Sequence, residues 1–421
     1  MLVDVADGLI TGVSSGAVAP SHAVRLEGLT LPGLANAHSH AFHRVLRGRT
    51  QLGAGSFWTW RAQMYELAER LDPDSYFTLA RAVYGEMVLA GITCVGEFHY
   101  LHHGAGGRPY DSPNVMGDVL IAAAGEAGLR ITLLDTCYLH GGIGVEPNEV
   151  QQRFSDGDAL SWVTRVSHLE APPHARVAAA IHSVRAVDPA SIEIIAAWAA
   201  ANEAPLHAHV SEQPAENQQC LGAFGLTPTE LLAERGSLGE RFTAVHATHL
   251  TDVDLDLLGR SNSTVCLCPT TERDLADGIG GGRALLDAGA RLSLGSDSHA
   301  VIDLFEEARA VELDERLATL ARGRHDSVSL LGAATQHGHA CLGWNDAGII
   351  AVGARADLVS VRLDSVRTAG TRPEHALDAA VFAASATDVH HVVIDGRVVV
   401  SNGSHHTLDV AGELARAVGR W

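Results

Sequence analysis

Eight short apolar runs, separated by longer alanine-rich stretches, organise the middle of the chain from about residue 31 to residue 345. The runs lie at 29–36, 92–98, 130–138, 176–183, 205–210, 242–247, 264–269 and 291–297. Helical patterns lie between or after them, for example at 75–90, 114–128, 189–203, 227–235, 252–260 and 303–322. Strands that alternate with helices build a parallel sheet, and eight such units close into a barrel. The sequence therefore predicts an α/β fold of the TIM type, a (β/α)8 barrel.

The two ends of the chain have a different texture from the middle. Residues 1–30 and 347–421 contain short β-branched runs broken by Gly and Asp, and 391–400 predicts a hairpin around Asp395 and Gly396. Each end is too small to fold alone. We therefore expect 1–30 and 347–421 to form one small β-sandwich domain together, and 31–346 to form the catalytic barrel.

The charge of the chain excludes several chemistries. All 30 basic residues are arginine, so no lysine is available for a Schiff base, a phosphate-binding loop or a carbamylated bridge between two metals. The 50 acidic residues leave a net charge of −20, which argues against nucleic acid or an anionic membrane as partner.

The remaining composition predicts a soluble protein of the cytoplasm. The six cysteines are irregularly spaced, and no basic leader or apolar stretch of about 18 residues is present. A homodimer is the usual expectation for such an enzyme.

Titratable and polar side chains gather at the ends of the predicted strands. They are His38, His40, Glu97, His99, Tyr100, His182, Arg185, His207, His209, Glu212, His246, Asp297 and His299. Because the carboxyl ends of barrel strands meet at one mouth, where active sites are built, we expect these side chains to converge.

His38 and His40 form an HxH pair on an extended segment, where alternation points both rings the same way. With His209 and Asp297 they would complete a nitrogen and oxygen site that suits zinc and leaves a position for water. The same donors also suit iron, manganese or nickel. The alternative is that these histidines are only hydrogen-bonded in a polar barrel mouth.

Two further residues suit acid–base work beside such a site. Glu212 lies three residues beyond His209 and could shuttle protons, and His246 could orient a water or polarise the bond under attack. Cys266 and Cys268 are interpreted as buried thiols rather than metal ligands, and His102 and His103 as solvated loop residues.

Together these residues resemble the amidohydrolase superfamily, in its deaminase branch with one metal ion. The resemblance rests on LPGL at 31–34 before HSH at 38–40, then on His209 with Glu212, His246 and SD at 296–297, and it covers the whole chain. It implies metal ligands at His38, His40, His209 and Asp297, a proton shuttle at Glu212 and a transition-state partner at His246. The lack of lysine agrees, since the branch with two metals commonly uses a carbamylated lysine.

Within that branch, the segments 38–48, 56–65, 97–103 and 182–187 are similar to those of the formimidoylglutamate deiminases of histidine degradation. This resemblance implies a zinc-dependent hydrolysis of N-formimidoyl-L-glutamate to N-formyl-L-glutamate and ammonia. The implied substrate contacts are Arg61, Tyr100, His182 and Arg185, together with His43, where the family often has glutamine.

The residues themselves also favour a small anionic substrate, because Arg61 and Arg185 are the natural partners for two carboxylates. Two alternatives stay open. One is a deaminase or chlorohydrolase for an aromatic heterocycle such as guanine, cytosine or adenosine, which would need an aromatic slot although aromatics are only 5% of the chain. The other is an inactive binding module, which we would expect to have lost a ligand or the shuttle.

Overall fold

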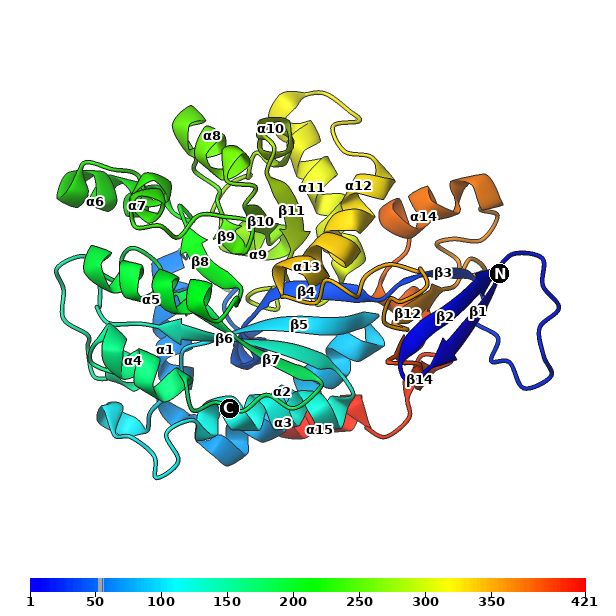
Figure 1. The fold of residues 1–421 in the computed structure, drawn as a ribbon, viewed down its shortest axis with the longest axis horizontal. Coiled ribbons are helices and arrows are strands. Elements are labelled where there is room, and N and C mark those ends of the chain that lie inside the picture. Colours follow the sequence, from blue (N-terminus) through cyan, green and yellow to red (C-terminus); the bar gives the residue numbers. More distant parts are fainter. Residues whose placement is uncertain (52–54, 56) are drawn as a thin grey trace.

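A closed barrel of eight parallel strands forms the centre of the molecule (Figure 1). The computed structural model describes residues 1–51, 55 and 57–421, so Ser56 of the segment 56–65 lies outside the described residues. The strands are β4 (Leu34–Ser39), β5 (Ile92–His99), β6 (Arg130–Cys137), β7 (Ala175–Ile181), β8 (Leu206–Val210), β9 (Phe242–His246), β10 (Thr264–Leu267) and β11 (Arg291–Leu294). Each predicted apolar run holds one of them. The first run is split by Gly33, and its beginning forms β3 (Leu29–Pro32).

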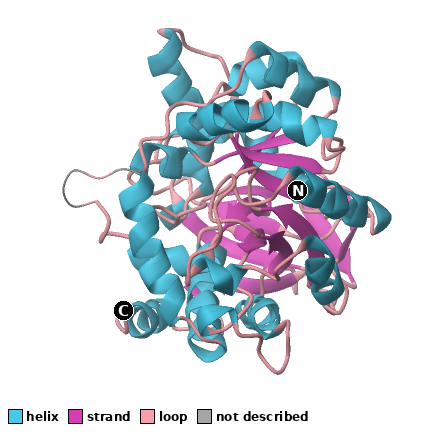
Figure 2. Cartoon of the chain, turned by 90° about the vertical axis from the view of Figure 1, so that its left-hand side faces the viewer, coloured by secondary structure: helices cyan, strands magenta, loops and turns pink. Residues whose placement is uncertain are grey.

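Helices surround the strands in a ring, which Figure 2 shows most clearly. They are α1 (Phe57–Arg70), α2 (Pro73–Leu89), α3 (Val115–Ala127), α4 (Ala159–Val166), α5 (Pro189–Ala201), α6 (Pro214–Phe224), α7 (Pro228–Glu234), α8 (Asp252–Arg260), α9 (Pro269–Asp274), α10 (Gly282–Ala288), α11 (Leu304–Thr319), α12 (Ser327–Gly332) and α13 (Gly338–Cys341), with short turns η1 (Ala41–Leu46), η2 (Ala105–Gly107), η3 (Gln151–Phe154) and η4 (Ala333–His337). Several begin in the same way: Asp72 and Asp188 accept backbone N–H groups of the first turn, and a proline follows each.

The barrel closes at a seam between its first and last strands. The amide of Asn36 donates to Ser296 Oγ (2.7 Å) and accepts from Ser296 N (2.9 Å). An isolated parallel bridge joins Ser39 to Asp297, and Asp297 N donates to the carbonyl of His38 (3.0 Å). At Gly295 a Cβ would lie 2.7 Å from Cβ of His38, so only glycine allows this close approach.

Both chain ends contribute to a second, smaller domain, as predicted. Its antiparallel sheet has the order β15-β14-β13-β12-β3, so β3 from the N-terminal end pairs with β12 (Leu358–Val361). The other strands are β13 (Val389–Ile394), β14 (Arg397–Ser401), β15 (Ser404–His405) and the separate hairpin of β1 (Leu2–Ala6) and β2 (Leu9–Ser14). The predicted turn between β13 and β14 is confirmed, with φ of 49° at Asp395 and 73° at Gly396.

The C-terminal part also contains α14 (Ala376–Phe382), α15 (Val410–Val418), η5 (Pro373–His375) and η6 (Ala386–Asp388). In the barrel wall, Arg130 Nη1 pairs with Asp395 Oδ1 of the small domain (2.7 Å), which ties the two parts together. The fold class is therefore confirmed. The division of the chain at residues 30 and 346 stays a prediction.

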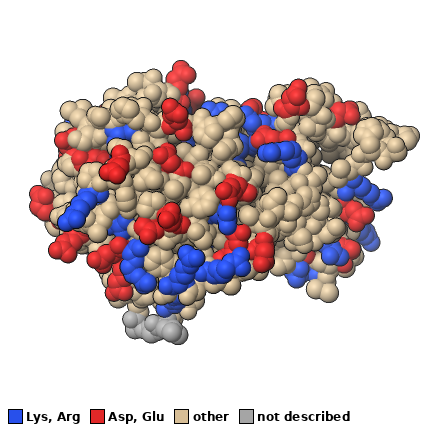
Figure 3. Space-filling view, turned by 90° about the horizontal axis from the view of Figure 1, so that it is seen from below, with Lys and Arg blue, Asp and Glu red and all other residues tan. Residues whose placement is uncertain are grey.

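The surface of the protein carries both signs of charge. Acidic and basic side chains are interspersed over the face shown in Figure 3, where every basic group is an arginine. Among the described residues, no helix has both the length and the apolar character needed to cross a bilayer.

Two interpretations of single residues can be compared directly with the structure. Cys266 and Cys268 are buried free thiols, as predicted. The interpretation of His102 and His103 as solvated was wrong. Both are buried: His102 Nε2 lies 2.9 Å from the carbonyl of Thr136, and His103 Nε2 lies 3.1 Å from a carboxylate oxygen of Asp156. The polar groups that stabilise them belong to residues far along the chain, and nothing in the local sequence indicates these partners.

Candidate active site at the mouth of the barrel

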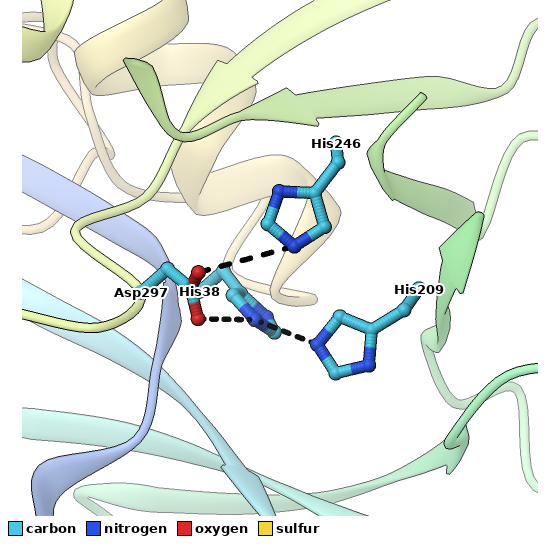
Figure 4. Close-up of side chains that lie close together, drawn as sticks. All are labelled: His38, His209, His246 and Asp297. Atoms are coloured by element: carbon cyan, nitrogen blue, oxygen red, sulfur yellow. Dashed lines mark hydrogen bonds and ion pairs between the residues drawn. The ribbon is translucent and has the colours of Figure 1, made fainter. Parts of the chain in front are cut away.

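Three imidazoles and one carboxylate converge at the carboxyl ends of the strands (Figure 4). His38 Nε2 lies 3.1 Å from His209 Nε2 and 3.3 Å from Asp297 Oδ1. His246 Nε2 lies 3.9 Å from Asp297 Oδ2. These residues come from β4, β8, β9 and the segment after β11, so the barrel brings together side chains that are far apart in the sequence.

His40 belongs to the same cluster through Asp297. Its Nε2 lies 3.4 Å from Asp297 Oδ1, and its Nδ1 lies 2.9 Å from the carbonyl of Phe98. That carbonyl fixes which nitrogen of the ring faces the cluster. Ser39, between the two histidines, points the other way and donates to Glu97 Oε2 (2.7 Å), as the alternation of an extended segment requires.

The donor set fits a divalent metal ion. An ion bound tetrahedrally at about 2.0–2.1 Å from each donor places the donors roughly 3.3 Å apart, which is close to the separations among His38, His209 and Asp297. Burial lowers the pKa of His38 and lowers that of His40 to about 3, so both rings are neutral at neutral pH. Burial alone would raise the pKa of Asp297, but the neighbouring imidazoles hold it well below its usual range. A bound divalent ion would polarise a water molecule and lower its pKa toward neutrality.

Glu97 accepts hydrogen bonds from the residues on both sides of His40. Its carboxylate accepts from Ala41 N (2.6 Å) as well as from Ser39, and burial raises its pKa to about 7. The sequence singled out Glu97 only as a polar residue at a strand end.

The backbone of the mouth is strained at several points. Ser211, His246, Ala247, Asp297 and His299 all have positive φ, between 38° and 67°, although none is glycine. Such conformations cost about 1–3 kcal/mol each and tend to cluster at functional sites. Here they lie where strands end and chemistry-bearing side chains turn into the mouth.

Glu212 lies between a histidine and an arginine. Its Oε1 is 3.7 Å from His246 Nε2, and its Oε2 is 3.7 Å from Arg185 Nη2. Burial raises the pKa of Glu212, although His246 and Arg185 oppose this. A carboxyl group whose pKa is raised beside the donor cluster is suited to hold and deliver a proton.

His246 is held among acidic groups. Burial lowers its pKa, but Glu212, Glu272 and Asp297 together raise it well above the ordinary value. A divalent ion in the cluster would act in the opposite direction.

A small inner cavity of about 50 Å³ lies beside the cluster, and an outer cavity of about 510 Å³ shares Arg61, Tyr138, His182 and Arg185 of its lining. The lining of the inner cavity includes nearly all the predicted site residues: His40, His43, Arg61, Tyr100, His182, Arg185, His209, Glu212, His246 and Asp297. His38 lies behind them as part of the cluster. The predicted residues thus meet in one place, while their roles stay predictions.

The two predicted arginine contacts differ in their surroundings. Arg61 on α1 stacks on Trp58 (4.8 Å) and Tyr65 (5.4 Å), and among the described residues no acidic group pairs with it. Arg185 is buried and lies 3.7–3.8 Å from Glu212 and Glu216. Both arginines line the inner and the outer cavity.

The inner cavity is rich in aromatic side chains despite the low aromatic content of the chain. It is lined by Phe57, Trp60, Tyr65, Tyr100, Tyr138 and Phe154. The low aromatic content of the whole chain is therefore no argument against a flat aromatic substrate. His43 lines this cavity, and its Nε2 lies 3.1 Å from the hydroxyl of Tyr100, which is itself predicted to contact the substrate.

Besides His38 and Glu97, three predicted polar residues do not line the cavity. His99 alternates with Phe98 and therefore points to the helix layer, where its ring lies 4.8 Å from that of His102. His207 lies inside the barrel, 3.0 Å from the carbonyl of Cys341. His299 lies 3.1 Å from Ser39 Oγ, behind the HxH pair.

Two buried carboxylates of the site were missed by the sequence reasoning. Glu216 accepts from Glu212 N (3.3 Å), and Glu272 lies 3.4 Å from His246 Nδ1. The signal for both was available: each follows the end of a barrel strand within one helical turn, the place where the other site residues were found.

A (β/α)8 barrel whose mouth holds imidazoles and a carboxylate able to ligate a metal ion is an arrangement typical of metal-dependent barrel hydrolases. Comparison with known proteins makes this specific. The sequence model described as Amidohydrolase family matches residues 29–399, and the chain belongs to that family as a hydrolase of C–N bonds.

Three proteins illustrate the likeness. The formimidoylglutamate deiminase of Pseudomonas aeruginosa is 36% identical over 414 residues, covering 95% of this chain and 90% of that protein. A crystal structure of an amidohydrolase from Brucella melitensis superposes with a TM-score of 0.92 at 32% identity, covering 99% of this chain and 95% of the other. An adenosine deaminase from Xanthomonas campestris with bound zinc gives a TM-score of 0.83 at 26% identity, with coverage of 99% and 91%.

Proposed function

We propose that this protein hydrolyses N-formimidoyl-L-glutamate to N-formyl-L-glutamate and ammonia, using one divalent metal ion, for which we favour zinc. The observation that carries the proposal is the pair of guanidinium groups, Arg61 and Arg185, which line the same cavity as Glu212, His246 and Asp297. In a dicarboxylate with a terminal amidine, the two carboxylates match the two arginines, and the amidine matches the cluster of Glu212, His246 and Asp297. The relative from Pseudomonas aeruginosa and the zinc bound to the Xanthomonas campestris protein support the substrate and the metal, respectively.

Substrate binding is assigned to the two arginines and their neighbours. Arg61 and Arg185 hold the two carboxylates of the glutamate part by charge-assisted hydrogen bonds. Tyr100, His182 and His43 line the wall between the arginines and the cluster and orient the formimidoyl group. The net charge of −20 opposes an anion at long range, so binding depends on these short-range contacts.

The protein residues supply the proton transfers. Asp297, which is ionised, accepts a proton from the water that attacks the formimidoyl carbon, or His246 does so in its neutral form, which a bound divalent ion would favour. Glu212 donates a proton to the terminal nitrogen, and ammonia leaves. The C–N bond to the terminal nitrogen breaks and a C=O bond forms in its place, so N-formyl-L-glutamate remains.

A second candidate is the hydrolytic deamination of an aromatic heterocycle. The aromatic lining of the inner cavity favours it, and so does the similarity to the adenosine deaminase of Xanthomonas campestris. However, a neutral heterocyclic base offers no carboxylate with which Arg61 and Arg185 could pair.

One assay separates the two candidates. Ammonia release by the metal-loaded protein is measured with N-formimidoyl-L-glutamate, N-formimidoylglycine, adenosine, guanine and cytosine. We expect kcat/KM for the glutamate derivative to exceed all others by about 100-fold or more, because the glycine derivative keeps the reacting group and lacks the second carboxylate. The E212Q variant, purified in the same way, controls for contaminating deaminases. Turnover of a heterocycle alone would replace the proposal with the second candidate.

A further inference from the structure

Glu272 is a buried carboxylate at the site to which the proposed reaction assigns no role. It lies in the first turn of α9 and is 4% exposed. Its Oε1 accepts from Cys268 N (2.9 Å) and lies 3.4 Å from His246 Nδ1. The backbone bond fixes the carboxylate, so its position relative to the histidine does not depend on a flexible side chain alone.

The opposite edge of the His246 ring faces the reaction centre. His246 Nε2 lies 3.7 Å from Glu212 Oε1 and 3.9 Å from Asp297 Oδ2. The backbone at His246 and Ala247 is left-handed, with φ of 67° and 50°, at the point where β9 ends. A ring at a strained position needs a partner that holds its orientation.

We propose that Glu272 is a positioning residue for His246. It accepts the Nδ1–H of the imidazole, which fixes the tautomer and the plane of the ring and leaves Nε2 for the reacting group. Carboxylate partners on the remote nitrogen of a catalytic histidine work in this way in general. The kinetic consequences rest on the proposed function, whereas the hydrogen bond itself does not.

A role in binding a second metal ion fits the same atoms less well. His246, Cys268 and Glu272 have potential ligand atoms within 4.8 Å of one another. However, burial raises the pKa of the Cys268 thiol well above its ordinary value, so this sulfur keeps its proton. Glu272 Oε1 already accepts from Cys268 N. The positioning role requires no change in the protonation of Cys268 or in the hydrogen bond between Cys268 N and Glu272.

The E272Q variant tests the proposal, with E307Q as the matched control. Glu307 is also buried and holds the same segment of chain, since it accepts from Thr270 N (2.9 Å), but its hydrogen bonds do not involve His246. We expect E272Q to lower kcat by about 10-fold to 100-fold with KM and metal content within about twofold of the parent protein. E307Q should retain kcat within about threefold.

A spectroscopic measurement tests the hydrogen bond without any substrate. In protein labelled with ¹⁵N-histidine, the Nδ1–H of His246 should give a downfield imidazole resonance that is lost in H246Q. It should be lost or moved upfield in E272Q, and it should persist in E307Q.

Four results would overturn the positioning role. They are an unchanged resonance in E272Q, a kcat of E272Q above half that of the parent, an equal loss in E307Q, and a change in KM or metal content without a change in kcat. If no substrate is turned over by the parent protein, the proposed function fails, while the resonance still decides the role of Glu272.

Discussion

The two arginines of the cavity should respond differently to the same substitution, because among the described residues only Arg185 pairs with acidic side chains. R61M removes the proposed contact to the substrate together with the stacking on Trp58 and Tyr65, but it leaves no described carboxylate without a partner. A charge-assisted hydrogen bond contributes about 1.5–3 kcal/mol, and each 1.4 kcal/mol is about a factor of ten. We therefore expect R61M to raise KM for N-formimidoyl-L-glutamate by about 10-fold to 150-fold, with kcat within a few fold.

R185M should change both kinetic constants. Arg185 lies 3.7 Å from Glu212 Oε2, and its charge lowers the pKa of that carboxyl group. Removing the charge raises the pKa of Glu212 further above its already raised value. The acid form then persists to higher pH, so the alkaline limb of the kcat profile should move upward in addition to the increase in KM.

Steady-state kinetics over a range of pH measure both effects, with R176M as control. Arg176 is exposed, stacks on Trp344 (4.3 Å) and lines a different cavity. Its replacement should leave both constants within about twofold. An unchanged KM in R61M and R185M alike would refute the assignment of a dicarboxylate substrate, even with the metal cluster intact.

Three further outcomes follow from the site and its surroundings. E212Q should retain its metal, as measured by elemental analysis, and lose about 10²–10⁴-fold in kcat; near-normal turnover would contradict its role as proton donor. Dialysis against a chelator should abolish activity, and zinc should restore it. The metal should stay bound down to about pH 5, because burial lowers the pKa of His40 to about 3. Release of the metal near the usual imidazole pKa would argue against these ligands. R165M should lower the free energy of unfolding in denaturant by about 3–5 kcal/mol, since it leaves the buried carboxylates of Asp135 and Asp156 without their partner at 2.8 Å, and a loss below about 1 kcal/mol would show that water replaces the guanidinium.

The barrel strands were predictable because their signal is local. Each run is apolar, short and bounded by turn residues, and burial on both faces of a parallel strand requires that pattern. The convergence of the site residues followed from topology alone, since strand ends meet at one mouth. Helices such as α1 and α6 have a weaker signal, because polar and aromatic residues interrupt their apolar periodicity.

The parts that could not be predicted depend on partners distant in the chain. His102 and His103 form a polar HH pair in a loop segment, and only the tertiary structure supplies Thr136 and Asp156 to bury them. The aromatic lining of the cavity combines residues of α1 and of loops after several strands, so a percentage for the whole chain says nothing about it. The place of Glu272 after β10 was a local signal, but its partner, Nδ1 of His246, belongs to the end of β9 and is known only from the tertiary structure.

The seam between β4 and β11 has a further consequence for how the protein folds. His38 and His40 lie at one side of the seam and Asp297 at the other, and the hydrogen bond between Asn36 and Ser296 spans 260 positions of sequence. The binding site is therefore completed only when the last barrel strand has joined the first, which is a late event for contacts so far apart. An ion bound there would link β4 to the segment after β11. Removing the ion should therefore destabilise the pairing of these two strands before the rest of the barrel. Hydrogen exchange in β4 and β11 should then rise before that of β6 and β7, which lie away from the seam and carry none of the proposed ligands.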